Sequence, residues 1–205
     1  MGKTGNTILA TITWALKEWA VAVEALLAGD LLLLIRKGGI REAQPVFAVP
    51  SDRVLLFPTY EHQAAAALRS PWQSRVETRS VPQVGDAMTL PGWAAITHQL
   101  ELTGGDIVQR LHPFHIWTDD WLTERLAWKP ERPAYALVLR VHRFTAPLTL
   151  TYEKRYGGCR SWIEPGAIAA LPESAPVLPE AEYQQRVRAM AAAIAPVTSS
   201  LAALE

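Results

Sequence analysis

A short basic segment, Arg36-Lys37-Gly38-Gly39-Ile40-Arg41, has the residue types of an anion-binding loop. Glycines let the backbone approach a ligand closely, and exposed amides beside cations attract phosphate groups. The segment lacks the GxxxxGK[ST] spacing of a Walker motif. We therefore predict an anion site formed by Arg36, Lys37, Gly38, Gly39 and Arg41. The competing interpretation is an ordinary solvated turn with surface charge.

Two later stretches also place cations where a ligand could contact them. Arg140 and His142 share one face of a predicted strand, where they either line a pocket or reach solvent at a sheet edge. Further along, cations surround an aromatic residue at Lys154, Arg155, Tyr156 and Arg160. Cations suit phosphate contact and aromatic rings suit base stacking, so these residues predict a nucleic-acid surface. A plain glycine turn at Gly157-Gly158 is the alternative.

A metal-dependent phosphodiesterase is the enzymatic alternative. A nuclease of the PD-(D/E)xK type needs an aspartate ending one strand and Glu-x-Lys on the next, which together hold Mg²⁺ and orient water. Asp52, Glu61 and His62 give a degenerate version that lacks the lysine. No set of cysteine, histidine and acidic residues has zinc-site spacing. We therefore predict neither a bound metal nor a cofactor, and we favour binding over catalysis.

Composition limits the classes of protein that fit. The 205 residues include 20 basic and 20 acidic ones, so the formal net charge is zero and any nucleic-acid surface must be local. A single cysteine, Cys159, predicts a reducing compartment. With no signal peptide and no long apolar run, we predict a cytoplasmic protein without a membrane partner. Eight tryptophans leave a protein-interaction module as a further alternative.

The elements that must position these residues alternate between strands and short helices. Apolar spacing at Leu16, Trp19, Val23 and Leu26 predicts a helix from Trp14 that stops at Gly29, before a buried strand over 31–35. Periodicity and turn residues predict strands over 54–57, 93–102, 135–143 and 148–152, and helices over 59–69, 118–128 and 180–195. The sequence thus predicts an α+β domain whose mostly antiparallel, barrel-like sheet has a leading helix and inserted short helices.

The same patterns predict the domain limits and two structural features. Residues 1–10 are expected to fray, residues 11–165 to form one domain, and residues 166–205 to form a proline-rich linker and a C-terminal helix. Trp121, Arg125 and Trp128 share one helix face, which predicts a stacked structural ladder. His98 lies between apolar residues of a strand face, which predicts a buried histidine with satisfied hydrogen bonds.

Five dispersed segments carry a family resemblance. In chain order they are Lys17-Glu18-Trp19, Arg36-Lys37-Gly38-Gly39-Ile40, Pro58-Thr59-Tyr60-Glu61-His62-Gln63, Pro113-Phe114-His115-Ile116-Trp117 and Tyr156-Gly157-Gly158-Cys159-Arg160-Ser161-Trp162. Together they resemble the bacterial domain-of-unknown-function 1802 family, which is common in cyanobacteria. Some members of that family carry this region beside an Mrr-type restriction endonuclease domain. The resemblance therefore implies nucleic acid and a restriction endonuclease as partners, by association alone.

A weaker similarity lies in the order of the predicted elements. A helix, a basic loop, several strands and a late long strand are similar to PUA-like domains of the ASCH and EVE kind, whose barrel cradles nucleic acid or a modified base. This similarity implies a PUA-like barrel. From both resemblances and the basic–aromatic stretches, we expect a module that recognises DNA, RNA or a modified base in a restriction or repair setting.

Overall fold

The computed structural model describes residues 11–37, 48–77, 80–166, 168 and 170–195. Its strands are β1 (Trp14–Trp19), β2 (Leu33–Lys37), β3 (Arg53–Thr59), β4 (Ala87–Leu102), β5 (Ala134–Thr151), β6 (Trp162–Ile163) and β7 (Ser174–Pro176). Its α-helices are α1 (Ala20–Ala28), α2 (Ile107–Leu111), α3 (Asp119–Ala127) and α4 (Glu180–Ile194). Short 3-10 helices lie at Ala65–Ala67, Trp72–Arg75, His112–Phe114 and Lys154–Tyr156. No helix in these ranges is long and apolar enough to cross a membrane.

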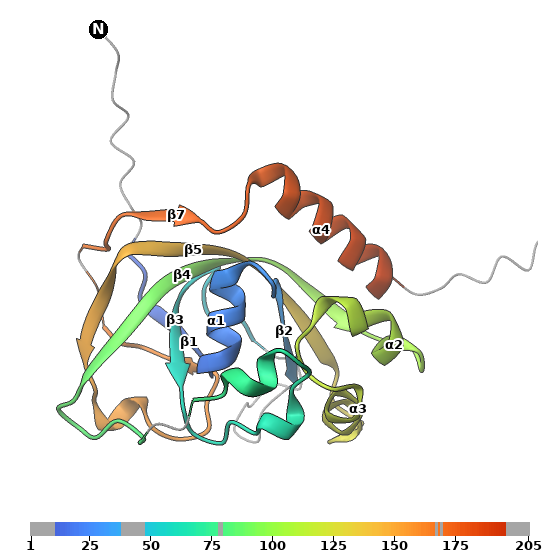
Figure 1. Ribbon diagram of the computed structural model, residues 1–205, viewed down its shortest axis with the longest axis horizontal. Coiled ribbons are helices and arrows are strands. Elements are labelled where there is room, and N and C mark those ends of the chain that lie inside the picture. The colour runs from blue at the N-terminus through green and yellow to red at the C-terminus, as the bar shows by residue number, and fades with distance from the viewer. Residues whose placement is uncertain (1–10, 38–47, 78–79, 167, 169, 196–205) are drawn as a thin grey trace, which may run out of the picture.

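All seven strands belong to one curled sheet (Figure 1). The strand order is β2-β5-β4-β3-β1-β6, and β7 pairs with β5. The long strands β4 and β5 pair from Ala87–Thr151 to Leu102–Ala134, with register shifts that bend them. Among the described strands only β1 and β3 run parallel. The predicted α+β class and the mostly antiparallel, curled sheet are confirmed.

The first predicted helix is wrong over its first half. Residues Trp14–Trp19 form β1, and α1 begins only at Ala20. Both Ala15 and Leu16 are fully buried, because β1 lies inside the sheet and is covered on both faces. Such a strand does not alternate, so its apolar residues mimicked a helical stripe. Gly29 is confirmed as the stop: it caps α1 with a φ of 80°, a left-handed conformation that suits glycine.

Two other predictions differ in extent. The helix predicted over 59–69 is absent: Thr59 ends β3, and only Ala65–Ala67 form a 3-10 turn. Ala65 and Ala66 are exposed, so this segment has no apolar face to bury, and helix propensity alone does not stabilise a short helix. The strands predicted over 135–143 and 148–152 are one continuous strand, β5. The predicted cap of α3 is confirmed, since the Thr118 hydroxyl accepts from the Trp121 amide at 3.2 Å.

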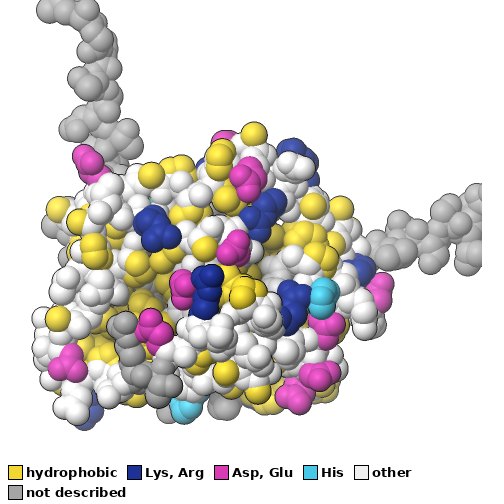
Figure 2. All heavy atoms as spheres, in the orientation of Figure 1, with side chains coloured by type: hydrophobic (Ala, Val, Ile, Leu, Met, Phe, Trp, Pro, Cys, Tyr) yellow, Lys and Arg dark blue, Asp and Glu magenta, His cyan; other side chains and the backbone are white. Residues whose placement is uncertain are grey.

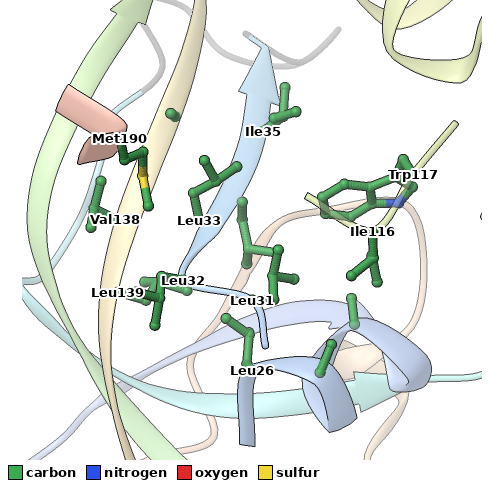
Figure 3. Close-up of a cluster of buried hydrophobic side chains, with 14 of the residues drawn as sticks. Leu26, Leu31, Leu32, Leu33, Ile35, Ile116, Trp117, Val138, Leu139 and Met190 are labelled. Atoms are coloured by element: carbon green, nitrogen blue, oxygen red, sulfur yellow. The ribbon is translucent and has the colours of Figure 1, made fainter. Parts of the chain in front are cut away.

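The main core forms where α1 and α4 pack against the sheet, including its strand β2. Leu26, Leu31 and Leu33 lie at its centre, beside Ile116 from the segment before α3 (Figure 3). A second cluster surrounds Phe57 on other parts of the sheet. The apolar stripe predicted for the last helix is confirmed, because all four of its members are buried: Tyr183, Val187, Met190 and Ile194. The proline-rich segment before α4 contains the short strand β7.

This packing predicts that α4 contributes to the stability of the whole domain. Met190 is 1 % exposed and lies beside Val138 and Leu33 (Figure 3). Met190→Ala should therefore lower the free energy of unfolding by about 2–5 kcal/mol, measured by urea denaturation. Gln185→Ala, an exposed position on the same helix, is the control and should change it by less than about 0.5 kcal/mol. Equal effects of the two substitutions would show that α4 is a separable appendage.

Candidate anion-binding site

A buried ion pair joins two strands that lie far apart in the sheet order. Glu18 on β1 and Arg36 on β2 meet at 2.7 Å, and their side chains are 10 % and 9 % exposed. The second terminal nitrogen of Arg36, Nη2, donates to the Lys17 carbonyl oxygen at 3.2 Å. Because β2 stands at one edge of the sheet and β1 is next to the other edge, these bonds connect the two sides of the curl.

Two more cations gather around this pair. Lys37 follows Arg36 on β2, is 5 % exposed, and donates from Nζ to the carbonyl of Leu126 on α3. The neighbouring residue on that helix is Arg125, which is partly buried. Its Nε is buried without a hydrogen-bond partner. Arg36 also has an unpartnered buried Nε. The cluster thus holds three cations and one buried carboxylate.

The charges of this cluster act on one another. Burial, and after it the Arg36 guanidinium, lower the pKa of Arg125, while the Glu18 carboxylate opposes them. Burial also lowers the pKa of Lys37, and the exposed carboxylate of Glu131 opposes that shift. Both pKa values fall because a charged group surrounded by protein loses hydration. A bound anion would compensate this loss, since it would bring opposite charge to the Arg125 guanidinium.

Indole rings continue the cluster along α3. The Arg125 guanidinium lies 6.0 Å from the ring centre of Trp121. Trp121 stacks on Trp117 at 5.1 Å and approaches Trp19 of β1 at 6.3 Å. The predicted ladder is therefore confirmed for Trp121 and Arg125 only. Trp128 is 40 % exposed and lies beneath Lys129 instead, because it follows the last turn of α3.

A polar edge completes this row of rings. His115 is 3 % exposed, lies 6.2 Å from Trp117, and has two buried ring nitrogens with no partner in the described chain. Arg69 donates to the His115 carbonyl and contacts the Nε2 atom of His112 at 2.7 Å. Since a guanidinium only donates, His112 accepts at Nε2 and donates from Nδ1 to Asp119 at 2.8 Å.

The opposite face of β1 positions a second group of motif residues. Lys17 donates from Nζ to the carbonyls of Tyr156 at 2.8 Å and Gly158 at 3.0 Å. Burial lowers the pKa of Lys17, and the Glu61 carboxylate opposes that shift. Gln63 accepts from the Val21 amide at 3.1 Å and so satisfies a free donor in the first turn of α1. The described residues of the five motif segments therefore meet around the carboxyl ends of β1 and β3.

Several predicted site residues lie elsewhere. Arg140 pairs with Glu180 of α4 at 3.1 Å and covers the Tyr183 ring at 4.6 Å. His142 stacks on Trp93 at 4.1 Å. Arg140 thus fastens α4 to β5, and His142 packs against β4 while its backbone pairs with Pro176 of β7. Neither residue lines the cation cluster. His98, predicted to be buried, is exposed and bonds to Thr97, because the bulge after Ile96 rotates that part of β4.

The stretch around Tyr156 is also arranged differently from a stacking surface. Tyr156 is 2 % exposed, packs against Phe57, and donates its hydroxyl to Glu153 at 2.9 Å. Its ring is therefore not available to a nucleic-acid base. Arg155 pairs with the same Glu153 at 2.9 Å, while Lys154 and Arg160 are exposed. Of these three cations, only Arg160 influences Lys17, because its positive charge lowers the pKa of that lysine.

The alternative catalytic residues do not converge. Asp52 precedes β3 and Glu61 follows it, so the seven residues of that strand separate them. At about 3.3 Å per residue, this spacing puts the two carboxylates roughly 20 Å apart. His62 is exposed beside Glu61. No group of three or more His, Cys, Asp or Glu residues in the described ranges is placed to hold a metal ion.

The structure describes only the first two residues of the predicted basic loop, Arg36 and Lys37. Gly38, Gly39 and Arg41 fall outside the described residues. Arg36 and Lys37 were expected on an exposed turn, but they are the buried end of β2. Glu18 was not among the predicted site residues, and Arg125 was expected to have a purely structural role. An acidic residue in one motif and a run of cations in another were a signal for their pairing, but nothing in the sequence set the distance between them.

The burial of His115 predicts a pH dependence of stability. Burial and then the Arg69 guanidinium lower the pKa of His115 from 6.5 to about 4. The unfolded chain therefore takes up this proton first as the pH falls, and stability present above pH 6.5 is lost between about 6.5 and 4. The loss should reach roughly 3 kcal/mol in wild type, measured by urea denaturation at several pH values. His115→Phe should flatten this part of the profile, and an unchanged profile would contradict the assignment.

Comparison with known proteins confirms the resemblance carried by the five segments. A family model described as "Domain of unknown function (DUF1802)" matches residues 15–189, well over half of the chain. No curated protein and no solved structure matches. The matched range contains the Glu18–Arg36 pair, Lys37, Arg125 and the indole row. This chain therefore belongs to the DUF1802 family of domains of unknown function.

Proposed function

We propose that this protein is a non-catalytic nucleic-acid-binding module that binds phosphate at the Arg36–Lys37–Arg125 cluster. The observation that carries the proposal is Arg125, whose buried Nε has no hydrogen-bond partner, beside two buried cations and one buried carboxylate. Proteins rarely leave charged groups desolvated and unpaired. An arginine fork is suited to a phosphate, whose oxygens it can contact in pairs.

The charge distribution favours contact with nucleic acid at a few positions over contact along a broad basic surface. The formal net charge of the chain is zero. On the face that carries α1, Lys and Arg side chains are interspersed with Asp and Glu and with apolar groups (Figure 2). That face has no continuous basic stripe of the kind that tracks a duplex backbone. Phosphate binding would therefore depend on a few well-placed cations.

The indoles beside Arg125 supply a second element of nucleic-acid recognition. Trp121 and Trp19 are both partly exposed. The Trp121 ring is already stacked on Trp117 and approached by Arg125, so the ring of Trp19 is the one left for a base. A base stacks on an aromatic ring without regard to its identity, at about 1–3 kcal/mol per base. Cations together with stacking rings are typical of proteins that bind single strands. We therefore favour single-stranded DNA or RNA over a duplex.

The other candidate functions have less support. A phosphodiesterase built on Asp52 and Glu61 would need carboxylates a few ångströms apart, and these two lie at opposite ends of β3. An interaction module that presents its tryptophans would need them at the surface. Of the eight, only Trp128 is exposed, so most of the indoles serve the core and the cation cluster.

Binding should depend on salt. For a labelled single-stranded 12-mer followed by fluorescence anisotropy, each phosphate that the protein neutralises contributes roughly −0.7 to the slope of log affinity against log salt concentration. Arg125→Gln should flatten the slope by about one contact's share and weaken binding to all sequences alike. Arg188→Gln, an exposed arginine on α4, is the matched control and should leave the slope unchanged.

The proposal fails on a simple result. If the wild-type protein shows no salt-dependent binding to single-stranded DNA or RNA between about 50 and 200 mM salt, the cluster does not bind nucleic acid.

A further inference from the structure

The depth of the cation cluster restricts which phosphate can reach it. Arg36 is 7 % exposed and Lys37 is 5 % exposed, so these two cations lie beneath the surface. Arg125 is only partly buried and forms the accessible part of the cluster. An internal phosphodiester is flanked by sugars on both sides, which keep it at the surface. A phosphate at the end of a strand has a sugar on one side only, so it can enter further.

The net charge of the cluster also favours a phosphate at the end of a strand over an internal one. Arg36, Lys37 and Arg125 bring three positive charges, and Glu18 is the buried carboxylate that opposes them. Glu131, which acts on Lys37, is exposed and therefore screened by solvent. The surplus of the cluster is therefore two positive charges. A phosphodiester carries one negative charge, whereas a phosphate monoester carries −1.5 to −2 at neutral pH, as phosphorylated side chains do.

The cations of the cluster are held in place before any ligand binds. The Nε atoms of Arg36 and Arg125 have no partner, but both are shielded from solvent, so the accessible part of the Arg125 guanidinium is what meets a phosphate. The Arg36 terminal nitrogens are held by Glu18 and the Lys17 carbonyl, so this side chain is fixed in position before any ligand binds. Lys37 is fixed in the same way by the Leu126 carbonyl. A preorganised set of donors lowers the entropy cost of binding.

We infer that the cluster is a terminal-phosphate site, which binds the phosphate monoester at the end of a single strand. The inference rests on the proposed function and narrows it to strand ends. A phosphate at either the 5′ or the 3′ end of a strand is a monoester, and experiment must decide which of the two ends binds.

Competition binding tests this inference with three otherwise identical short oligonucleotides: 5′-phosphorylated, 3′-phosphorylated and unphosphorylated. We expect at least one phosphorylated form to bind about tenfold more tightly than the unphosphorylated form, as a new charge-assisted contact would provide. Arg125→Gln should remove this preference. Arg125→Lys keeps the charge without the fork and should retain part of it, and Arg188→Gln should retain all of it.

Each outcome bears on one proposal. Equal affinity for all three oligonucleotides, with salt-dependent binding intact, overturns the terminal-phosphate site and leaves the nucleic-acid module standing. Absence of binding to all three overturns the proposed function itself. A preference that survives in a folded Arg125→Gln protein, checked by circular dichroism, also overturns the assignment to this cluster. Should Arg125→Gln not fold, a full preference in Arg125→Lys would lead to the same conclusion.

Discussion

The buried ion pair between Glu18 and Arg36 is the contact on which the rest of the site depends. It joins β1 and β2, strands separated by most of the sheet order, across the open side of the curl. Placing two charges out of water is costly, and their attraction repays that cost only with good geometry and further hydrogen bonds. Here the further bonds exist: Glu18 also accepts from the Trp19 amide, and Arg36 donates to the Lys17 carbonyl.

The pair also explains why the motif segments meet. Successive residues of a strand point to opposite faces, so Lys17 and Glu18 serve different surroundings. Lys17 holds the turn around Tyr156 and Gly158, while Glu18 holds Arg36. The following residue, Trp19, contacts Trp121 of α3. Three consecutive residues of β1 thus connect the late glycine turn, the end of β2 and the indole row, which are remote in the sequence.

Local features of the fold could be predicted because they depend on neighbouring residues. Gly29 ends α1, Thr118 caps α3, and the stripe of α4 is buried, each as its pattern indicates. Pairing partners could not be predicted in the same way. Trp14–Trp19 form a strand because β3 pairs with them. No residue in that segment indicates that β3 will be the partner. Tertiary pairing overrides local propensity in such segments.

In the candidate site, too, residue types could be predicted from the sequence but tertiary surroundings could not. Arg36 and Lys37 were predicted by residue type as part of an anion-binding loop with Gly38, Gly39 and Arg41, and the structure places these two residues beside Arg125. Their burial was not predicted, because consecutive cations before glycines are typical of exposed turns. Arg125 was expected to stack on tryptophan, and it does so at Trp121. That its buried Nε has no hydrogen-bond partner follows only from the neighbours that the fold brings to it.

A double-mutant cycle on Glu18 and Arg36 tests this account most directly. The free energy of unfolding would be measured by urea denaturation for wild type, Glu18→Gln, Arg36→Gln and the double variant. If the pair holds the two sides of the sheet together, each single change leaves a buried charge unpaired and costs about 3–5 kcal/mol, while the double variant loses much less than the sum. The predicted coupling is about 2 kcal/mol or more. Additive losses, with a coupling below about 0.5 kcal/mol, would contradict the central role of this pair.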